Sequence, residues 1–228
     1  MSFLGELLYA PSRYHLRDLI HEIFIMGTYD VGSLPDNPVI VDVGANIDIA
    51  TFFFVHRYAP SRLLAFEPDP DAFSMLRRNI TRNGWDRVEC HNMALAEKAG
   101  QMDLFYDAEH PASLHTSGVM ARMPKQSRLV QCQPLSTLLP QQVDLLKLDI
   151  EGMEWEVFDD LVSTGSMTSI DRMIIEYHHH LPLNDDRLSR FLSPLEEAGF
   201  GYKIDADYVP GSNQKSYQDV LIYAYKKT

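Results

Sequence analysis

Four side chains that can move protons or bind metal ions follow two apolar runs of the sequence. Asp149 and Glu151 come directly after one run, and Glu176 and His178 end the other. Carboxylates and imidazoles serve as general acids and bases and as ligands of divalent ions. If the two runs are neighbouring parallel strands, their carboxyl ends meet at one edge of a sheet, where open α/β folds hold their ligands. We therefore expect a chemical centre at this edge.

A glycine turn forms a second candidate site. Residues 39–48, Val-Ile-Val-Asp-Val-Gly-Ala-Asn-Ile-Asp, begin as an apolar strand and end in the turn, and the apolar residues 49–58 can form a helix. This order suits a nucleotide-like ligand that lies across the carboxyl end of the strand. Residues 63–66 predict a second strand ending at Glu67, whose carboxylate can accept both hydrogen bonds of a ribose diol. Together these features predict a ligand that contains a ribose.

The glycine count of the turn distinguishes between two classes of ligand. A dinucleotide site usually carries three glycines, and only Gly44 is present here, with Asn46 and Asp48 at the next alternate positions. A carboxylate at a helix N-terminus would repel a phosphate. S-adenosylmethionine contains adenine and ribose but no phosphate, so the turn favours this cofactor. A nicotinamide oxidoreductase is a distant alternative.

Five blocks of the chain resemble the FkbM-type family of S-adenosylmethionine-dependent O-methyltransferases, in the family's order and spacing. They are Val-Asp-Val-Gly-Ala-Asn-Ile at 41–47, Ala-Phe-Glu-Pro-Asp-Pro at 65–70, Asn-Met-Ala-Leu at 92–95, Leu-Lys-Leu-Asp-Ile-Glu-Gly-Met-Glu at 146–154 and Ile-Ile-Glu-Tyr-His at 174–178. Each block alone is a weak signal, but five in register are specific. The resemblance covers roughly residues 38–226.

The resemblance implies a fold, an activity and a cofactor. The fold is the α/β, Rossmann-like fold of class I methyltransferases, a seven-stranded, mostly parallel sheet with a C-terminal antiparallel strand and helices on both faces. The activity is transfer of a methyl group from S-adenosylmethionine to a hydroxyl of a small molecule, typically a sugar or another secondary metabolite. Within the matching blocks, the expected cofactor-binding residues are Asp42, Gly44, Ala45, Asn46, Glu67, Pro68, Ala94 and Asp149.

Asp48 departs from the family pattern, which has glycine at this position. A carboxylate about 4 Å from the carboxylate of the cofactor would cost up to roughly 4 kcal/mol at an effective dielectric constant near 20. The cost shrinks or reverses if Asp48 faces the cofactor's amino group or turns away to cap the helix. The alternative function is therefore a catalytically silent, methyltransferase-like binding protein whose cofactor site is altered by Asp48.

The acidic pair of the first centre has a functional and a structural interpretation. In methyl transfer, alignment can supply about 7–11 kcal/mol, whereas a general base contributes a factor of about 10²–10⁴. We expect Asp149 or Glu151 to contact the methionine end of the cofactor or a metal, while the other orients the acceptor. The structural alternative is that one of them caps the following helix.

His178 completes the expected catalytic set with Asp149 and Glu151, in one of two ways. Alternation along a strand places Glu176, His178 and His180 on one side. A divalent cation such as Mg²⁺, held by Asp149, Glu176 and His178, could act as a Lewis acid by analogy with catechol-type O-methyltransferases. In the metal-free alternative, His178 is a general base that Glu176 orients.

Composition limits the class of partner and the cellular setting. The 228 residues carry a formal net charge of −12 and 45% hydrophobic residues, which suits one sizeable core and disfavours binding to nucleic acid or an anionic membrane surface. The expected partner is a small hydroxylated acceptor. Cys90 and Cys132 predict free thiols. Without a signal peptide or a membrane-spanning run, a cytoplasmic protein is expected. The sequence carries no signal for an oligomeric state.

Hydrophobic periodicity predicts alternating strands and helices that end in a hairpin, with residues 1–36 as an N-terminal helical cap and 37–228 as one methyltransferase domain. The expected helices are 13–26, 49–58, one capped by Asp69 and Pro70 and stopped at 83–84, 153–162 and 184–198. The expected strands after residue 66 are 88–91, 102–106, 143–148 and 173–175, with a hairpin of 201–204 and 220–225 across a turn containing Pro210 and Gly211.

Four further assignments concern residues around the expected site. Residues 107–129 show no period and are expected to form a loop over the site, from which Ser113 and His115 would touch the acceptor. Lys147 is expected to pair structurally with a carboxylate. Trp85 and Trp155 are expected to serve packing.

Overall fold

The computed structural model describes residues 2–106, 126–179, 187–206 and 218–227. Its centre is a seven-stranded sheet in the order β11-β12-β10-β9-β3-β4-β5. The strands are β3 (Val39–Val43), β4 (Arg62–Phe66), β5 (Val88–His91), β9 (Leu145–Leu148), β10 (Arg172–His179), β11 (Phe200–Ala206) and β12 (Gln218–Lys226). Only the pairings of β12 with β10 and β11 are antiparallel, so one strand of the sheet is reversed. The predicted fold class is confirmed.

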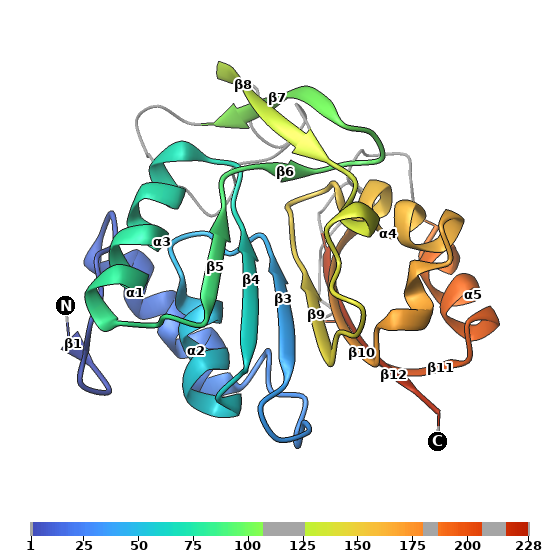
Figure 1. Cartoon of the computed structure of the whole chain (residues 1–228), viewed down its shortest axis with the longest axis horizontal. Coiled ribbons are helices and arrows are strands. Elements are labelled where there is room, and N and C mark those ends of the chain that lie inside the picture. Colours follow the sequence, from blue (N-terminus) through green and yellow to red (C-terminus); the bar gives the residue numbers. More distant parts are fainter. Residues whose placement is uncertain (1, 107–125, 180–186, 207–217, 228) are drawn as a thin grey trace, which may run out of the picture.

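The central strands are apolar on both sides because helices cover both faces of the sheet (Figure 1). Successive side chains of a strand point to opposite faces, and the two cores follow this alternation: Ile40 packs into one core, and its neighbour Val41 into the other. α1 (Arg13–Ile20), α2 (Ile49–Tyr58) and α3 (Pro70–Asn83) contribute to the first core, and α4 (Glu154–Ser163) and α5 (Ser189–Glu197) to the second.

The helix that follows Glu67 begins and ends where the sequence predicts. The Asp69 carboxylate accepts the backbone N–H groups of Asp71 and Ala72, at 2.7 and 3.2 Å, and Pro70 occupies the first helical position. Gly84 ends α3 with a φ of 68°, in the left-handed region that favours glycine. These caps fix the start of α3 beside the carboxyl end of β4.

A small three-stranded sheet lies over the carboxyl edge of the large one (Figure 1). It contains β6 (Ala94–Leu95), β7 (Gly100–Tyr106) and β8 (Gln126–Gln133), in the order β6-β8-β7. The expectation of a loop is therefore wrong for residues 126–129, which belong to β8. The rest of that segment, including Ser113 and His115, lies outside the described residues, as do His180, the first residues of the expected helix 184–198, and the turn with Pro210 and Gly211.

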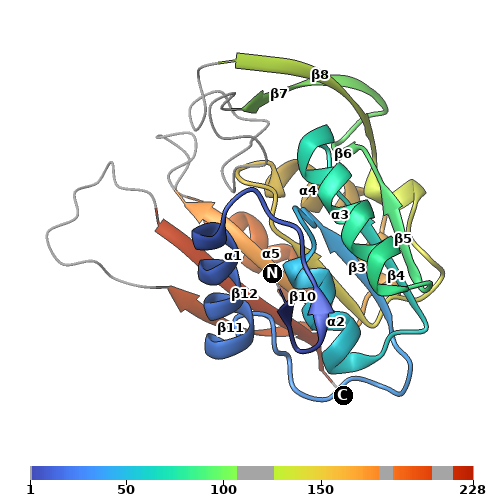
Figure 2. The same ribbon diagram turned by 90° about the vertical axis from the view of Figure 1, so that its left-hand side faces the viewer.

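The N-terminal segment packs into the first core. Leu16, Leu19, Ile20 and Ile23 are buried with residues of α2 and β3. The expected helix 13–26 is present, but its second half, His21–Met26, is a π-helical turn that ends at Gly27. Figure 2 shows α1 on the face of the sheet that α2 also covers. Two short strands, β1 (Ser2–Phe3) and β2 (Glu6–Leu7), precede it.

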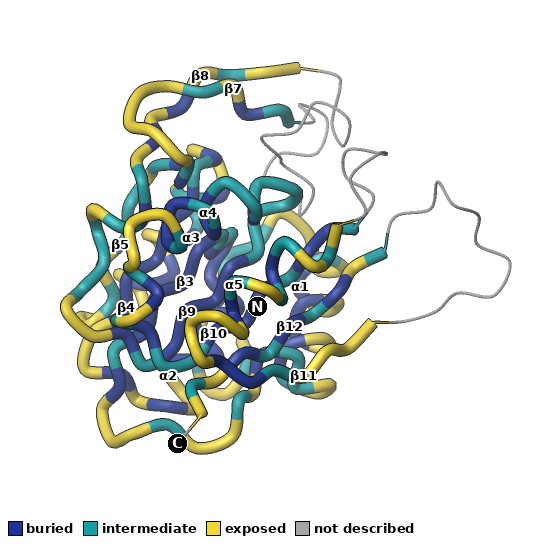
Figure 3. The backbone as a smooth tube through the Cα atoms, turned by 90° about the vertical axis from the view of Figure 1, so that its right-hand side faces the viewer, coloured by how far each residue is buried: buried dark blue, intermediate teal, exposed yellow. Residues whose placement is uncertain are grey.

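Burial is concentrated in the strands at the centre of the sheet, and exposed positions lie on loops, on the outer helices, on β8 and on part of β11 (Figure 3). Leu146 and Leu148 of β9 are completely buried, whereas Leu129 of β8 is 66% exposed. Within the described part of the chain, no helix combines the length and the apolar composition that a bilayer crossing requires.

Truncation of a core leucine should reveal how much the second core stabilises the fold. Leu161 of α4 is completely buried, and we expect Leu161→Ala to lower the free energy of unfolding by about 2–5 kcal/mol, through lost transfer energy and a residual cavity. Leu129→Ala removes the same atoms from an exposed position and should change it by less than about 0.5 kcal/mol. Urea unfolding followed by circular dichroism measures both, and equal losses would contradict this assignment of the core.

Candidate active site

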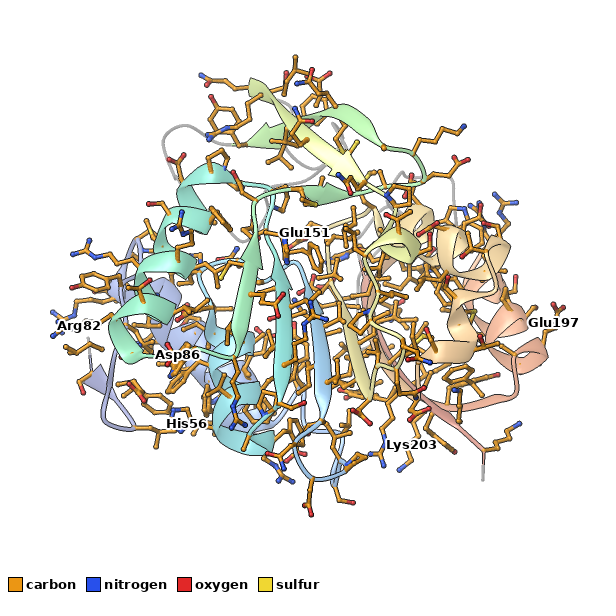
Figure 4. All side chains as sticks on the ribbon, in the orientation of Figure 1. His56, Arg82, Asp86, Glu151, Glu197 and Lys203 are labelled. Carbon is orange, nitrogen blue, oxygen red and sulfur yellow. The ribbon has the colours of Figure 1, made fainter. Side chains whose placement is uncertain are left out.

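A cavity opens at the carboxyl ends of β3, β4 and β9, below the small sheet. Figure 4 labels Glu151, which lies at this upper edge beneath β6. Three loops of the large sheet form its floor, the small sheet supplies apolar residues, and the N-terminal segment closes one side. The residues that line the cavity include Leu19, Ile23, Tyr29, Gly44, Ala45, Asn46, Glu67, Pro68, Met93, Ala94, Met102, Leu104, Lys147, Asp149, Glu151 and Met153.

The glycine turn is built for close approach of two strand ends. Gly44 has a φ of 84°, and a Cβ atom there would lie 1.8 Å from the carbonyl oxygen of Asp149, so only glycine fits. The N–H groups of Gly44 and Ala45 both donate to the carbonyl of Phe66, at 3.0 and 2.9 Å. The turn therefore ties the ends of β3, β4 and β9 together at the floor of the cavity.

Glu67 lies at the end of β4, where the sequence predicts it. Its carboxyl accepts the backbone N–H groups of Asn46 at 2.8 Å and of Asp69 at 2.7 Å. Burial raises the pKa of Glu67 to about 8. Whether ionised or protonated, the carboxyl group has more hydrogen-bonding sites than these two, so the backbone bonds fix its orientation and leave capacity for ribose hydroxyls.

Pro68 and Ala94, two further predicted cofactor contacts, also line the cavity, next to Met93. Asn92 connects their two loops, because its side-chain amide donates to the carbonyls of Glu67 and Pro68 at 2.8 and 3.1 Å. The loops after β4 and β5 thus form one wall of the cavity.

A buried ion-pair network lies beneath the turn. Lys147 is 2% exposed, and its ammonium group lies 3.5 Å from Asp42, 3.2 Å from Asp149 and 2.8 Å from the carbonyl oxygen of Gly44. Burial alone would lower the pKa of Lys147, but the two carboxylates outweigh it and raise that pKa. Lys147 therefore stays charged, and its expected structural pairing with a carboxylate is present.

Asp42 does not lie where a direct cofactor contact requires. It is completely buried and is not part of the cavity wall. Its carboxylate accepts the Thr51 hydroxyl at 2.7 Å and faces Lys147. The structure gives Asp42 a supporting role, because its carboxylate lies on the face of the sheet that α2 covers, next to Thr51.

Tyr29 is a functional candidate that the sequence analysis missed. Its hydroxyl lies 3.0 Å from a carboxyl oxygen of Asp149 and 3.2 Å from one of Glu176, and its side chain lines the cavity. Burial and the Asp149 charge raise the pKa of Glu176 well above its usual value. For Asp149 burial acts in the same direction, but Lys147 and His178 outweigh it and lower the pKa. A neutral Glu176 and an ionised Asp149 can thus share the single hydroxyl.

His178 is engaged on both ring nitrogens. Nδ1 lies 2.9 Å from Glu154 and Nε2 lies 3.1 Å from Glu151, and the side chain is 2% exposed. Burial would lower the pKa of His178, but Glu154 and Glu151 outweigh it and raise that pKa well above its usual value. The two carboxylates favour the protonated ring, which disfavours the expected role of His178 as a general base. Glu154, and not Glu176, orients the ring.

Two groups of side chains could hold a cation among the described residues. Asp149, Glu151 and His178 offer ligand atoms within 4.8 Å of one another, and so do Glu176, His178 and Asp219. The predicted set of Asp149, Glu176 and His178 is split between these groups. A mixed set of oxygen and imidazole ligands suits transition metals such as Mn²⁺ better than Mg²⁺, which prefers six oxygens.

Asp48 lies outside the cavity wall and makes no capping hydrogen bond with its side chain. Its side chain is completely buried and its φ of 111° falls in the region that favours glycine. Burial raises the pKa of Asp48 well above its usual value. The helix cap considered for Asp48 is absent, and its buried carboxyl in a strained conformation is expected to destabilise the fold.

The two tryptophans pack as expected. The ring of Trp85 stacks on Phe52 with 5.4 Å between centroids, and the Arg190 guanidinium lies 3.7 Å above the ring of Trp155. Cys90 and Cys132 are free thiols.

Comparison with known proteins places the chain in a family. Residues 42–202 match the family described as the Methyltransferase FkbM domain. A protein named Methyltransferase 1 from Beauveria bassiana is 30% identical over 70% of this chain and 72% of its own length. Methyltransferase sdnD from Sordaria araneosa is 31% identical over 65% of this chain and 70% of its own length.

Solved structures share the fold. Methyltransferase FkbM from Methylobacillus flagellatus KT superposes with a TM-score of 0.56 at 19% identity, over 86% of this chain and 45% of that one. The M. jannaschii TYW2 structure in complex with AdoMet superposes with a TM-score of 0.52 at 16% identity, over 98% of this chain and 83% of that one.

Replacement of Asp48 by glycine should stabilise the protein in a pH-dependent way. Relief of the backbone strain is expected to raise the free energy of unfolding by about 1–3 kcal/mol. Removal of the buried carboxyl group adds a second, pH-dependent contribution to this gain in the free energy of unfolding. Because its folded-state pKa is raised, it costs little below its unfolded pKa of about 3.9 and destabilises increasingly as the pH rises above that value. The gain from Asp48→Gly should therefore be larger at neutral than at acidic pH.

Asp48→Asn is the matched control, because asparagine tolerates positive φ better than most residues and carries no charge. It should show the pH-dependent part of the gain without full relief of strain. Urea unfolding across the acidic and neutral range measures both variants. A gain that is the same at every pH would show that the carboxyl group is not the cause.

Proposed function

The chain belongs to the FkbM methyltransferase family, and from this premise we propose that it transfers the methyl group of S-adenosylmethionine to a hydroxyl oxygen of a small molecule. Dependence on S-adenosylmethionine follows from the family. The observation that carries the proposal is a single cavity that joins the Gly44 turn, Glu67 and Asp149 at the carboxyl ends of three adjacent parallel strands. This is the edge at which open α/β sheets bind their ligands.

The chain supplies contacts for the ribose, the adenine and the amino group of the cofactor. Glu67 can accept the ribose hydroxyls, and the wall formed by Pro68, Met93 and Ala94 is apolar enough for adenine. Asp149 is held ionised by Lys147 and can accept a hydrogen bond from an ammonium group or from a hydroxyl. When bound, S-adenosylmethionine supplies an electrophilic methyl group whose departure leaves a neutral thioether. The protein's task is to align, desolvate and deprotonate the acceptor.

Alignment carries most of this task. Tyr29 and Lys147 fix Asp149 from two sides, so its carboxylate is preorganised at the polar end of the cavity. Leu19, Ile23 and Met153 line the same cavity and help to exclude water. Fixed geometry can lower a barrier by about 7–11 kcal/mol, which exceeds what a general base usually adds. Asp149, or Glu151 through water, receives the proton of the hydroxyl.

A cation-assisted route is the second candidate. It is favoured by the convergence of Asp149, Glu151 and His178, whose ligand atoms lie within 4.8 Å of one another, and it requires that an ion replace the proton on His178. A divalent ion there would lower the pKa of a bound hydroxyl as a Lewis acid. The two routes differ in how the rate of methyl transfer responds to a chelator.

The proposed acceptor is a small hydroxylated molecule, such as a sugar or another secondary metabolite. Among the described residues, the cavity wall is largely apolar, with carboxyl groups only at the ends of β4 and β9, which suits an uncharged molecule that presents a hydroxyl group. The net charge of −12 supports an acceptor other than nucleic acid and a site of action away from anionic membrane surfaces.

Cofactor binding is the first test. S-adenosylhomocysteine should bind the full chain in a 1:1 complex, measured by calorimetry. Glu67→Ala should weaken binding by about tenfold or more, since it removes the ribose acceptor and leaves the Asn46 and Asp69 N–H groups unpaired. Glu89→Ala removes an exposed glutamate of β5 and should leave binding unchanged. Absence of binding by the folded wild-type chain would contradict the proposal.

The same titration distinguishes the catalytically silent alternative. Because Asp48 lies off the cavity wall, Asp48→Gly should bind S-adenosylhomocysteine with the affinity of the wild type. If the glycine variant alone binds, Asp48 has abolished the site, and the silent protein is the correct interpretation.

Methyl transfer is the second test. Methyl-labelled S-adenosylmethionine and a panel of phenols, aliphatic alcohols and sugars should yield a labelled product with a methoxy carbon in its NMR spectrum. Asp149→Asn keeps the shape but not the charge and should slow transfer about 10²-fold or more. Retained rates after exposure to EDTA support the metal-free route, and loss that Mn²⁺ restores supports the cation-assisted route. An N-methyl or C-methyl product would contradict O-methyl transfer.

A further inference from the structure

One face of α3 is strongly basic although the chain as a whole is acidic. Arg77, Arg78 and Arg82 are exposed, and residues 72–85 contain no aspartate or glutamate. The formal net charge of the chain is −12, so three arginines without an intervening acid form a local reversal of sign. In Figure 4, the side chain of Arg82 projects away from the body of the protein.

Helical geometry gathers these arginines into a stripe. Ser74, Arg77, Arg78, Thr81 and Arg82 follow the spacing i, i+3, i+4, i+7 and i+8, which places them on one side of the helix. The opposite side carries Ala72, Leu76 and Ile80, which are buried in the first core. The core thus determines which face of α3 is presented to solvent, and that face is basic. We call these five residues the basic stripe.

The basic stripe borders a groove with aromatic walls. The groove is lined by Tyr9, Phe73 and the five residues of the stripe. The Arg78 guanidinium stacks 3.5 Å from the ring centroid of Tyr9, and that of Arg77 lies 6.0 Å from the ring of Phe73. Stacking restricts these side chains, so less conformational entropy is lost when an anion pairs with them.

No carboxylate neutralises the basic stripe within the described part of the chain. The ion pairs found there involve Arg17, Arg57, Arg62 and Arg128, but not Arg77, Arg78 or Arg82. Arg78 and Arg82 are four residues apart on the helix, a spacing at which like charges repel. Because the ion pairs of the described residues leave these guanidinium groups unused, the groups keep their capacity for bidentate pairing with external carboxylates.

We propose that the basic stripe, with Tyr9 and Phe73, is a docking surface for an acidic helix of a protein partner. The arginines are spread over about 7.5 Å along the helix axis, which matches carboxylates on successive turns of a second helix better than one compact phosphate. Aromatic rings beside the arginines provide the apolar contact that protein interfaces add to charge pairing. The surface is separate from the cavity, and this inference is independent of the reaction proposed above.

The test uses the full chain and a fluorescein-labelled helical peptide of about 20 residues that carries glutamates along one face. Fluorescence anisotropy at low ionic strength measures its affinity. The triple variant R77Q/R78Q/R82Q should bind about tenfold more weakly or worse. The matched control K98Q/K203Q/K227Q makes the same change of net charge at exposed lysines elsewhere and should bind within about twofold of the wild type.

Three results would overturn the proposal. The first is equal binding by the wild type and the arginine variant, and the second is an equal loss in the lysine control. The third is tighter binding of an RNA hairpin than of the peptide, which would assign the groove to nucleic acid. A peptide of identical composition with its glutamates spread around the helix should bind more weakly, and equal affinity would also exclude helix docking. If the triple variant does not fold, the single variant R82Q should still show a measurable loss.

Discussion

The buried ammonium group of Lys147 is the interaction on which the site depends. It lies between Asp42 and Asp149 and donates to the carbonyl of Gly44, so one side chain joins the middle of β3, the end of β9 and the glycine turn. Breaking a buried pair costs about 3–5 kcal/mol because a charge is left without a partner. The network thus makes the positions of the turn and of Asp149 dependent on each other. It also keeps Asp149 ionised despite its burial, which is what an acceptor of hydrogen bonds requires.

The N-terminal segment completes the site from outside the part of the chain that matches the family. The match covers residues 42–202, yet Leu19, Ile23 and Tyr29 line the cavity. Tyr29 bonds to the carboxyl groups of Asp149, just after β9, and of Glu176 in β10. The segment is packed into the first core by its buried leucines and isoleucines. Its place over the cavity is therefore determined by the same hydrophobic packing that orders α2.

Local sequence patterns predict the parts of the fold that local physics determines. The periodicity of residues 49–58 and the caps Asp69 and Gly84 give the two helices beside the turn, and both have the predicted bounds. The strand β8 was missed because only Val130 and Cys132 of its eight residues are buried, so its apolar signal is weak. The position of Glu67 at the end of β4 can be predicted, because the end of an apolar run is visible in the sequence.

Roles that depend on contacts between distant parts of the chain cannot be predicted from local sequence patterns. Tyr29 is separated from its partners by 120 and 147 residues, and no pattern near Tyr29 indicates them. The sequence alone suggests a general base for His178, but Glu154 of α4 lies on one ring nitrogen and favours the protonated ring. The most direct test of the account is a crystal structure with S-adenosylhomocysteine. It should show the ribose hydroxyls on Glu67 and the thioether sulfur near Asp149, and an adenosyl group bound anywhere else would contradict the account.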